Sequence, residues 1–132
     1  MYRTVVRDFR ELVCWQLAHA LKCEVLEFTA TEPAASDFKY CDQIRSSSAS
    51  APGNIAEAFG HFGCGDAARF CEYAIASLQE TLNHLIDGRD RKYLQPELCS
   101  RLSNLARSAL RATKNWMFYL KREAAARRRR KR

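Results

Sequence analysis

Apolar side chains recur every three to four residues along most of the chain, which is the period of an α-helix. This period predicts four helices, over about residues 7–29, 37–59, 66–86 and from 96 to beyond 120. The sequence has only 5 glycines and 3 prolines, fewer turn residues than an all-β fold of this length requires. Four helices joined by short connections predict an all-α fold, an antiparallel up-down-up-down four-helix bundle.

The first predicted helix has apolar residues on two nearly opposite sides. A helix with two apolar sides has two surfaces to pack against, so one side is expected to face the bundle and the other a neighbouring subunit or a partner protein. Trp15 and Leu26 are therefore candidates for an oligomer interface. The expected bundle side contains Phe9, Val13, Leu17, Ala20 and Leu21, and the second side contains Trp15, His19, Lys22 and Leu26.

The second predicted helix contains Pro52 and Gly53. A proline inside a helix removes one backbone hydrogen bond and crowds the carbonyl four residues earlier, so a kink or break is expected near Ser50. The core positions expected on this helix are Ile44, Ile55 and Phe59. The glycine-containing stretch over residues 60–65 predicts a loop, and it lacks the strand and the Gly-Lys-Ser/Thr sequence of a phosphate-binding loop.

The third and fourth predicted helices carry clear boundary signals. Asp66 is a favourable N-cap, Gly88 is expected just past the end of the third helix, and Pro96 suits the first turn of the fourth. Along the fourth helix, spacings of four and three predict a coiled-coil-like core seam. This seam contains Leu98, Leu102, Leu105, Ala109, Ala112, Trp116 and Tyr119, and a basic stripe of Arg107, Arg111, Lys114 and Lys121 lies across from it.

The net charge of +7 is concentrated at the C-terminal end. Residues 1–120 sum to zero and form the predicted bundle, whereas residues 121–132 form a basic tail with one acid, Glu123. Guanidinium groups suit phosphates, and release of counterions favours each contact without reading sequence. The tail therefore predicts binding to RNA or DNA, with a solvated end that only aids solubility as the alternative. The candidate nucleic-acid-binding residues are Arg107, Arg111, Lys114, Lys121, Arg122, Arg127, Arg128, Arg129, Arg130, Lys131 and Arg132.

Enzymatic chemistry has little support in the sequence, and no catalytic residue, cofactor or metal ligand is expected. Asn54, Glu57 and His61 share one side of the second helix; Glu57 and His61 have the residue types of an acid–base pair or of metal ligands, but polar packing explains them better. The 6 cysteines form no CxxC pair, which favours buried, reduced thiols in a cytoplasmic protein. No apolar run is long enough to cross a membrane.

Three segments resemble the proteins encoded in intervening sequences of bacterial 23S ribosomal RNA genes. Residues 13–21 (VCWQLAHAL) resemble the first-helix signature of that family, and residues 43–60 (QIRSSSASAPGNIAEAFG) resemble its pattern Q-[IM]-R-R-A-A-x-S-[IV]-x-x-N-I-A-E-G-x-G. Residues 70–85 continue the similarity, which spans about residues 7–120. The sequence departs from the family at Ser46, Ala58 and His61, where a basic residue, a glycine and a basic residue are usual. The positions aligned in the third segment are Ala74, Ser77, Leu78 and Glu80.

The resemblance implies an antiparallel four-helix bundle that assembles into a homopentamer and has no known catalytic activity. A related bundle is the accessory protein of diversity-generating retroelements, which binds a reverse transcriptase and nucleic acid. Two functions are therefore expected: an oligomeric nucleic-acid-binding protein, or an interaction scaffold for a partner such as a reverse transcriptase. The basic tail lies beyond the family's core, so its role does not come from the resemblance.

Overall fold

The computed structural model describes residues 6–62 and 65–131, and in these residues every regular element is helical. The four long helices are α1 (Val13–Thr29), α2 (Phe38–Gly60), α3 (Ala67–Asp90) and α4 (Pro96–Arg130). Short 3-10 turns, η1 (Phe9–Glu11) and η2 (Ala34–Ser36), precede α1 and α2. The predicted all-α, four-helix fold is confirmed.

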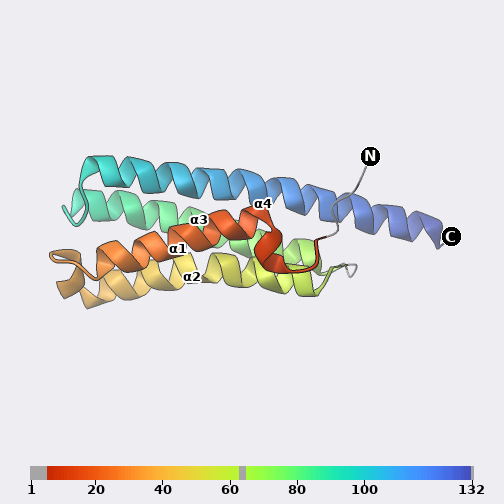
Figure 1. The fold of residues 1–132 in the computed structure, drawn as a ribbon, viewed down its shortest axis with the longest axis horizontal. Helices are drawn as coiled ribbons and strands as arrows, with labels where there is room; N and C mark the ends of the chain where they lie inside the picture. Colours follow the sequence, from red (N-terminus) through yellow and green to blue (C-terminus); the bar gives the residue numbers. More distant parts are fainter. Residues whose placement is uncertain (1–5, 63–64, 132) are drawn as a thin grey trace.

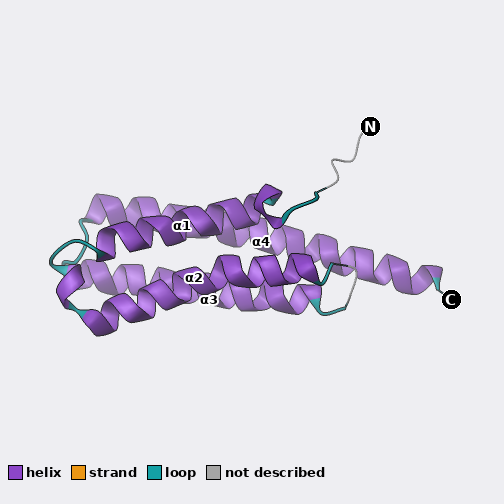
Figure 2. Ribbon diagram, turned by 60° about the horizontal axis from the view of Figure 1, so that its bottom comes forward, coloured by secondary structure: helices purple, strands orange, loops and turns teal. Residues whose placement is uncertain are grey.

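The helices form one bundle in which each packs on the next in sequence and α4 returns against α1. In Figure 1 the colours advance in opposite directions along successive helices, so neighbours in sequence run antiparallel. The α1–α2 and α3–α4 connections therefore meet at one end of the bundle, and α4 ends at the other. Figure 2 shows the last turns of α4 extending past the ends of the other three helices.

The core is built from aliphatic side chains of all four helices, but α1 presents a different side from the one predicted. Leu21 is buried as expected, whereas Val13 is 61% exposed and Ala20 is exposed. Phe9 lies in η1, ahead of the helix, and with Leu17 is only half-buried. The side chains that α1 buries are Cys14, Ala18, Leu21, Val25, Phe28 and Thr29.

The core face of α4 is also offset from the prediction, by about one residue. Leu102 and Ala109 are buried as expected, but Leu98, Leu105, Ala112, Trp116 and Tyr119 are half-buried at its edge. Because one residue turns an α-helix by about 100°, the basic stripe lies beside the core face rather than opposite it. The residues that α4 buries are Cys99, Leu102, Ser103, Ala106, Ala109, Leu110, Thr113, Met117 and Leu120.

Helix α2 continues through Pro52 without the predicted break. The amide of Asn54 donates to the carbonyl oxygen of Ser50 at 2.9 Å, and Ser77 on α3 donates to the Ser50 hydroxyl at 2.9 Å. A further hydrogen bond, between buried side chains, joins the hydroxyls of Ser47 and Thr81 at 2.8 Å. The Ser77–Ser50 and Ser47–Thr81 hydrogen bonds hold the proline-containing part of α2 against α3. Ile44 and Ile55 are buried as expected, and Phe59 is half-buried.

Helix α3 runs past Gly88, so the prediction that this glycine ends the helix is wrong. The left-handed backbone conformation belongs instead to Lys92, with φ of 64°. The amides of Lys92 and Tyr93 donate to the carbonyl oxygens of Arg89 at 2.9 Å and Gly88 at 2.8 Å. This is the bonding pattern of a Schellman cap, with a lysine where glycine is usual. Asp66 stands at the N-cap of α3 as predicted, although its side chain makes no capping hydrogen bond.

Candidate nucleic-acid interface on helix α4

The basic stripe on the middle of α4 is exposed and faces solvent beside α3. Arg107 reaches Asn104 at 3.5 Å and Arg111 reaches Ser108 at 3.4 Å, both neutral groups one turn earlier on the same helix. Lys114 is exposed as well. Lys121 Nζ lies 3.8 Å from a carboxylate oxygen of Glu72 on α3, a pair exposed on both sides. The stripe thus keeps most of its positive charge available.

The C-terminal turns of α4 carry the densest charge, and we call residues 121–131 the basic arm. Leu120 is the last buried residue of the helix. Among the described residues, no carboxylate lies within 4.0 Å of Arg122 or of any basic residue from Arg127 to Lys131. Arg132, also predicted to bind, lies outside the described residues. The arm is helical to Arg130, so its guanidinium groups are spaced by the helix rather than along an extended tail.

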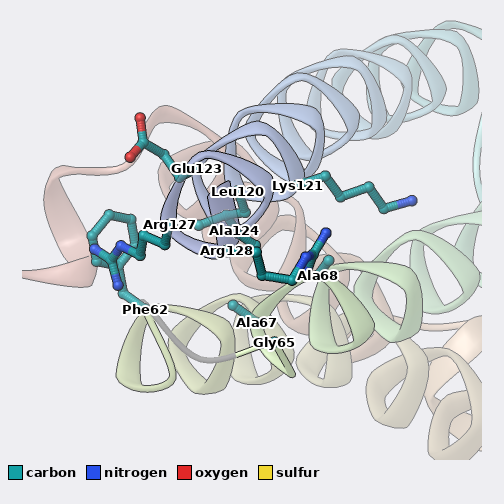
Figure 3. Close-up of a pocket in the computed structure, with 10 residues that line it drawn as sticks. All are labelled: Phe62, Gly65, Ala67, Ala68, Leu120, Lys121, Glu123, Ala124, Arg127 and Arg128. Atoms are coloured by element: carbon teal, nitrogen blue, oxygen red, sulfur yellow. The ribbon is translucent and has the colours of Figure 1, made fainter. Parts of the chain in front are cut away.

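Arg127 differs from its neighbours because it packs onto the bundle. Its guanidinium carbon lies 5.5 Å from the centre of the Phe62 ring, within the range of a cation–π contact. The Phe62 ring in turn lies parallel to Tyr119 of α4, with ring centres 6.4 Å apart. Figure 3 shows the Arg127 side chain turned toward Phe62. This contact joins Arg127, the first residue of the arginine run, to the segment that follows α2.

A cavity of about 320 Å³ lies where the arm leaves the bundle. Its apolar wall comes from Ala67 and Ala68 at the start of α3 and from Leu120 and Ala124 on α4. Positive side chains from α4 stand around the apolar wall, and Figure 3 shows Glu123 pointing away from Ala67 and Ala68. Sequence reasoning missed this cavity, since its walls come from three separate segments. The remaining lining residues are Phe62, Gly65, Lys121, Glu123, Arg127 and Arg128.

The two candidate interface residues on α1 have different surroundings. Trp15 is half-buried, stacked on His19 with ring centres 4.5 Å apart and meeting Phe9 edge-on at 5.3 Å. Leu26 is 44% exposed. Trp15 therefore packs within its own chain, and Leu26 is the more available of the two. An oligomer interface at these residues stays a prediction.

The polar residues considered for catalysis fall into two separate sets of contacts. Asn54 bonds to Ser50 on its own helix, and Glu57 and His61 form an exposed pair at 3.8 Å. His61 also stacks on Phe70 of α3 with ring centres 4.9 Å apart, a packing contact between helices. The described residues contain no group of three His, Cys, Asp or Glu side chains placed to hold a metal.

The described cysteines are unpaired thiols, and most are buried as predicted. Burial raises the pKa of Cys14 to about 11 and that of Cys71 to about 12. Cys23 is the exception, because it is exposed and its sulfur lies 3.6 Å from Nε2 of His19. Cys64 lies outside the described residues. No helix in the described part of the chain combines the length and apolarity of a membrane span.

The fold and the surface together define a four-helix-bundle protein whose last helix carries a cationic extension. A comparison with family models identifies its kind: residues 10–115 match the model of the 23S rRNA-intervening sequence protein family, and the chain belongs to that family. A search of curated proteins gives no match. The matched region includes Arg107, Arg111 and Lys114 of the basic stripe and ends before the basic arm.

Proposed function

We propose that this protein is a non-enzymatic, oligomeric helical bundle that binds the phosphate backbone of RNA or DNA through the basic arm. The observation that carries the proposal is the extension of α4 past the bundle with exposed arginines that have no carboxylate partner among the described residues. A cation already neutralised by a carboxylate gains less from a phosphate, because the first partner must be released. Within the arm this cost applies only to Lys121, which lies 3.8 Å from Glu72, and the arginines of the arm do not carry it.

Binding of this kind reads charge and shape rather than sequence. Each phosphate neutralised by lysine or arginine releases condensed counterions, so affinity falls steeply as salt rises. The arm lies on an exposed helix that offers guanidinium groups on several sides, which suits backbone contacts better than a set of base-specific hydrogen bonds. Arg107, Arg111 and Lys114 extend the charged surface along the same helix.

Oligomerisation belongs to the same proposal. The family resemblance favours a homopentamer, and exposed apolar residues on α1, Leu26 and Val13, supply surface for it. Several arms on one particle engage one nucleic acid with a combined strength well above that of a single arm. We place the assembled protein in the bacterial cytoplasm, consistent with its free thiols.

A second candidate function is an interaction scaffold, for example an accessory subunit of a reverse transcriptase in a diversity-generating retroelement. Phe38, in the first turn of α2, favours it because its side chain is 82% exposed. Exposed aromatic side chains are frequent anchors at protein interfaces. Helix α2 begins, with Phe38, at the end of the bundle opposite the C-terminal end of α4 (Figure 1), so a protein partner there leaves the arm free for nucleic acid.

The test is fluorescence-anisotropy titration of a structured RNA and a duplex DNA across a salt series. Two full-length variants each remove three positive charges: Arg128, Arg129 and Arg130 to Gln in the arm, or Arg107, Arg111 and Lys114 to Gln in the stripe. The arm variant is expected to lose most of the affinity, and its plot of log affinity against log salt is expected to flatten by about 0.9 for each phosphate contact removed.

The matched stripe variant separates the arm from charge in general. Equal losses in the two variants would show that binding is spread along α4 and would overturn the assignment to the arm. No binding by the wild-type protein at physiological salt would overturn the nucleic-acid proposal altogether. Light scattering checks the oligomer, since a monomer at micromolar concentration would contradict that part.

A further inference from the structure

The cavity at the base of the arm has an apolar wall and positively charged side chains around it. One wall is apolar and shallow, because alanines stand at positions 67, 68 and 124 where larger side chains would fill the space. The other walls carry the aliphatic stems and positive ends of Lys121, Arg127 and Arg128. A volume of about 320 Å³ lies near the lower end of the range for small-molecule pockets. The cavity is therefore the size of a small ligand, not of a duplex.

The chemistry of these walls suits a flat apolar group that carries a negative charge on one side. Planar rings stack on aromatic side chains and on guanidinium planes. Phe62 and Arg127, which are in contact with each other, both line the cavity, and Phe62 remains 43% exposed for a further stacking partner. Arg128 crosses toward Ala68 in Figure 3, so its charge stands at the mouth of the apolar surface. A nucleotide has this combination of a flat base and an anionic phosphate.

A second hollow continues from the cavity along the arm. It has a volume of about 510 Å³ and shares Gly65, Ala124, Arg127 and Arg128 with the first, adding Arg130 and Lys131. The two hollows together form one cationic path that starts at the apolar wall and leads outward. A strand with a base in the cavity thus has its next phosphates beside further basic side chains.

We propose that the cavity takes one unpaired nucleotide of the bound nucleic acid, while the arm holds the phosphates that follow it. This inference rests on the proposed function, since the arm must first bind the backbone. It adds a preference for strands with an unstacked base, such as a bulge, a loop or a free end. Stacking on protein side chains tolerates any base, so the preference is for unpaired structure and not for sequence.

The experiment compares two RNA probes that share one stem, in the presence of the full-length protein. In one probe the stem carries a single bulged 2-aminopurine, and in the other the same 2-aminopurine is paired. Because stacking one base on protein side chains contributes about 1–3 kcal/mol, we expect the wild-type protein to bind the bulged probe about tenfold more tightly and to change its fluorescence on binding. The same pair of probes in DNA shows whether the ribose hydroxyl matters.

Two alanines on the same helix provide the matched variants. Ala124→Leu fills the cavity and keeps every charge, whereas Ala126→Leu makes the same change at a position that does not line it. Ala124→Leu is expected to abolish the tenfold preference for the bulged probe and to leave the affinity for the paired probe unchanged. Ala126→Leu is expected to leave both the preference and the affinity unchanged. Arg128→Gln and Arg129→Gln form a second pair, because only the first of these arginines lines the cavity.

The outcomes separate this inference from the function on which it rests. The cavity proposal is wrong if Ala124→Leu prefers the bulged probe as strongly as Ala126→Leu does, or if the wild-type protein has no preference for the bulged probe. In either case, salt-dependent binding of the paired probe still supports the role of the arm. If neither probe binds, both proposals fall. Circular dichroism of each variant confirms that the helices remain folded.

Discussion

The phenol of Tyr40 on α2 occupies the space that a side chain at position 88 on α3 would need. Tyr40 donates a hydrogen bond to the carbonyl oxygen of His84 at 2.7 Å, and a Cβ added to Gly88 would overlap the Tyr40 hydroxyl. The same Cβ would stand 2.9 Å from a methyl carbon of Leu94. Gly88 therefore permits close approach of a buried tyrosine to α3, which explains a glycine in the interior of a helix despite its low helix propensity.

Gly88→Ala is expected to destabilise the protein by about 1–3 kcal/mol, because overpacking and the displaced Tyr40 hydrogen bond outweigh the gain in helix propensity. Gly53→Ala is the control, since Gly53 is exposed in α2 and has open space around it. That change is expected to stabilise by up to about 1 kcal/mol. Urea unfolding at fixed protein concentration measures both. A stabilising Gly88→Ala would show that Tyr40 moves aside freely.

Asp37 makes stability depend on pH at the end of the bundle. The Tyr93 hydroxyl donates to its carboxylate at 2.5 Å and the Tyr40 amide donates at 3.1 Å, and these hydrogen bonds hold the Asp37 pKa below its usual value of 3.8. A lowered carboxyl pKa contributes stability above the unfolded-state value, and this contribution disappears as pH falls through the folded-state value.

Tyr93→Phe is therefore expected to cost stability at pH 7 and progressively less as pH drops below about 4. Urea unfolding of wild type and variant between pH 2.5 and pH 7 tests this. Tyr73→Phe, at an exposed tyrosine of α3, is the control and should show no such trend. If the unfolding free energies of wild type and Tyr93→Phe differ by the same amount at every pH from 2.5 to 7, the role of Asp37 is contradicted.

Alkylation is expected to discriminate sharply among the thiols. Cys23 is exposed, while Cys14 and Cys71 are buried with pKa values of about 11 and about 12. Because the thiolate is the reactive form, iodoacetamide at pH 8 should modify Cys23 in the native protein and the other two only in urea. Site-resolved mass spectrometry reads the result. Fast labelling of Cys14 or Cys71 without denaturant would mean that the bundle opens more readily than its packing indicates.

Glutamate substitutions at two alanines of α4 test which face of that helix is buried in the core. Ala106 is fully buried, and Ala112 is half-buried at the edge of the core. Ala106→Glu places an unpaired carboxylate in the core and is expected to cost more than about 3 kcal/mol or to prevent folding. Ala112→Glu should cost less than about 1 kcal/mol, because its carboxylate reaches water. Thermal unfolding of the two variants decides which face is buried, and the reverse order would favour the face expected from sequence.

The number, order and approximate limits of the helices follow from the sequence, but the core face of α4 does not. Two sets of positions one residue apart both repeat at spacings of four and three. The set at the edge of the core has the larger apolar side chains, such as Leu105 and Trp116, whereas the buried set includes Ser103 and Thr113. The Thr113 hydroxyl donates to the Ala109 carbonyl at 2.7 Å, which removes the cost of burying it. A hydrophobicity pattern does not register a hydrogen bond of that kind.

The candidate site, like the fold, could be predicted from the sequence only in part. The basic residues are visible in the sequence because most of them form one run, and the fourth predicted helix extends beyond residue 120. The cavity was not foreseeable, since an alanine in a sequence signals helix propensity and not the space beside it. Phe62 acquires its role only when the end of α2 is brought to Arg127, more than sixty residues later in the chain.

The basic arm also decides how the particles behave toward one another. Residues 1–120 are electroneutral in formal charge, so the repulsion that keeps copies of the protein apart comes from the arm alone. Proteins near zero net charge associate and precipitate more readily than charged ones. If the arm binds phosphates as proposed, each bound phosphate removes part of this repulsion. A nucleic acid just large enough to neutralise the arm is then expected to lower the solubility of the protein.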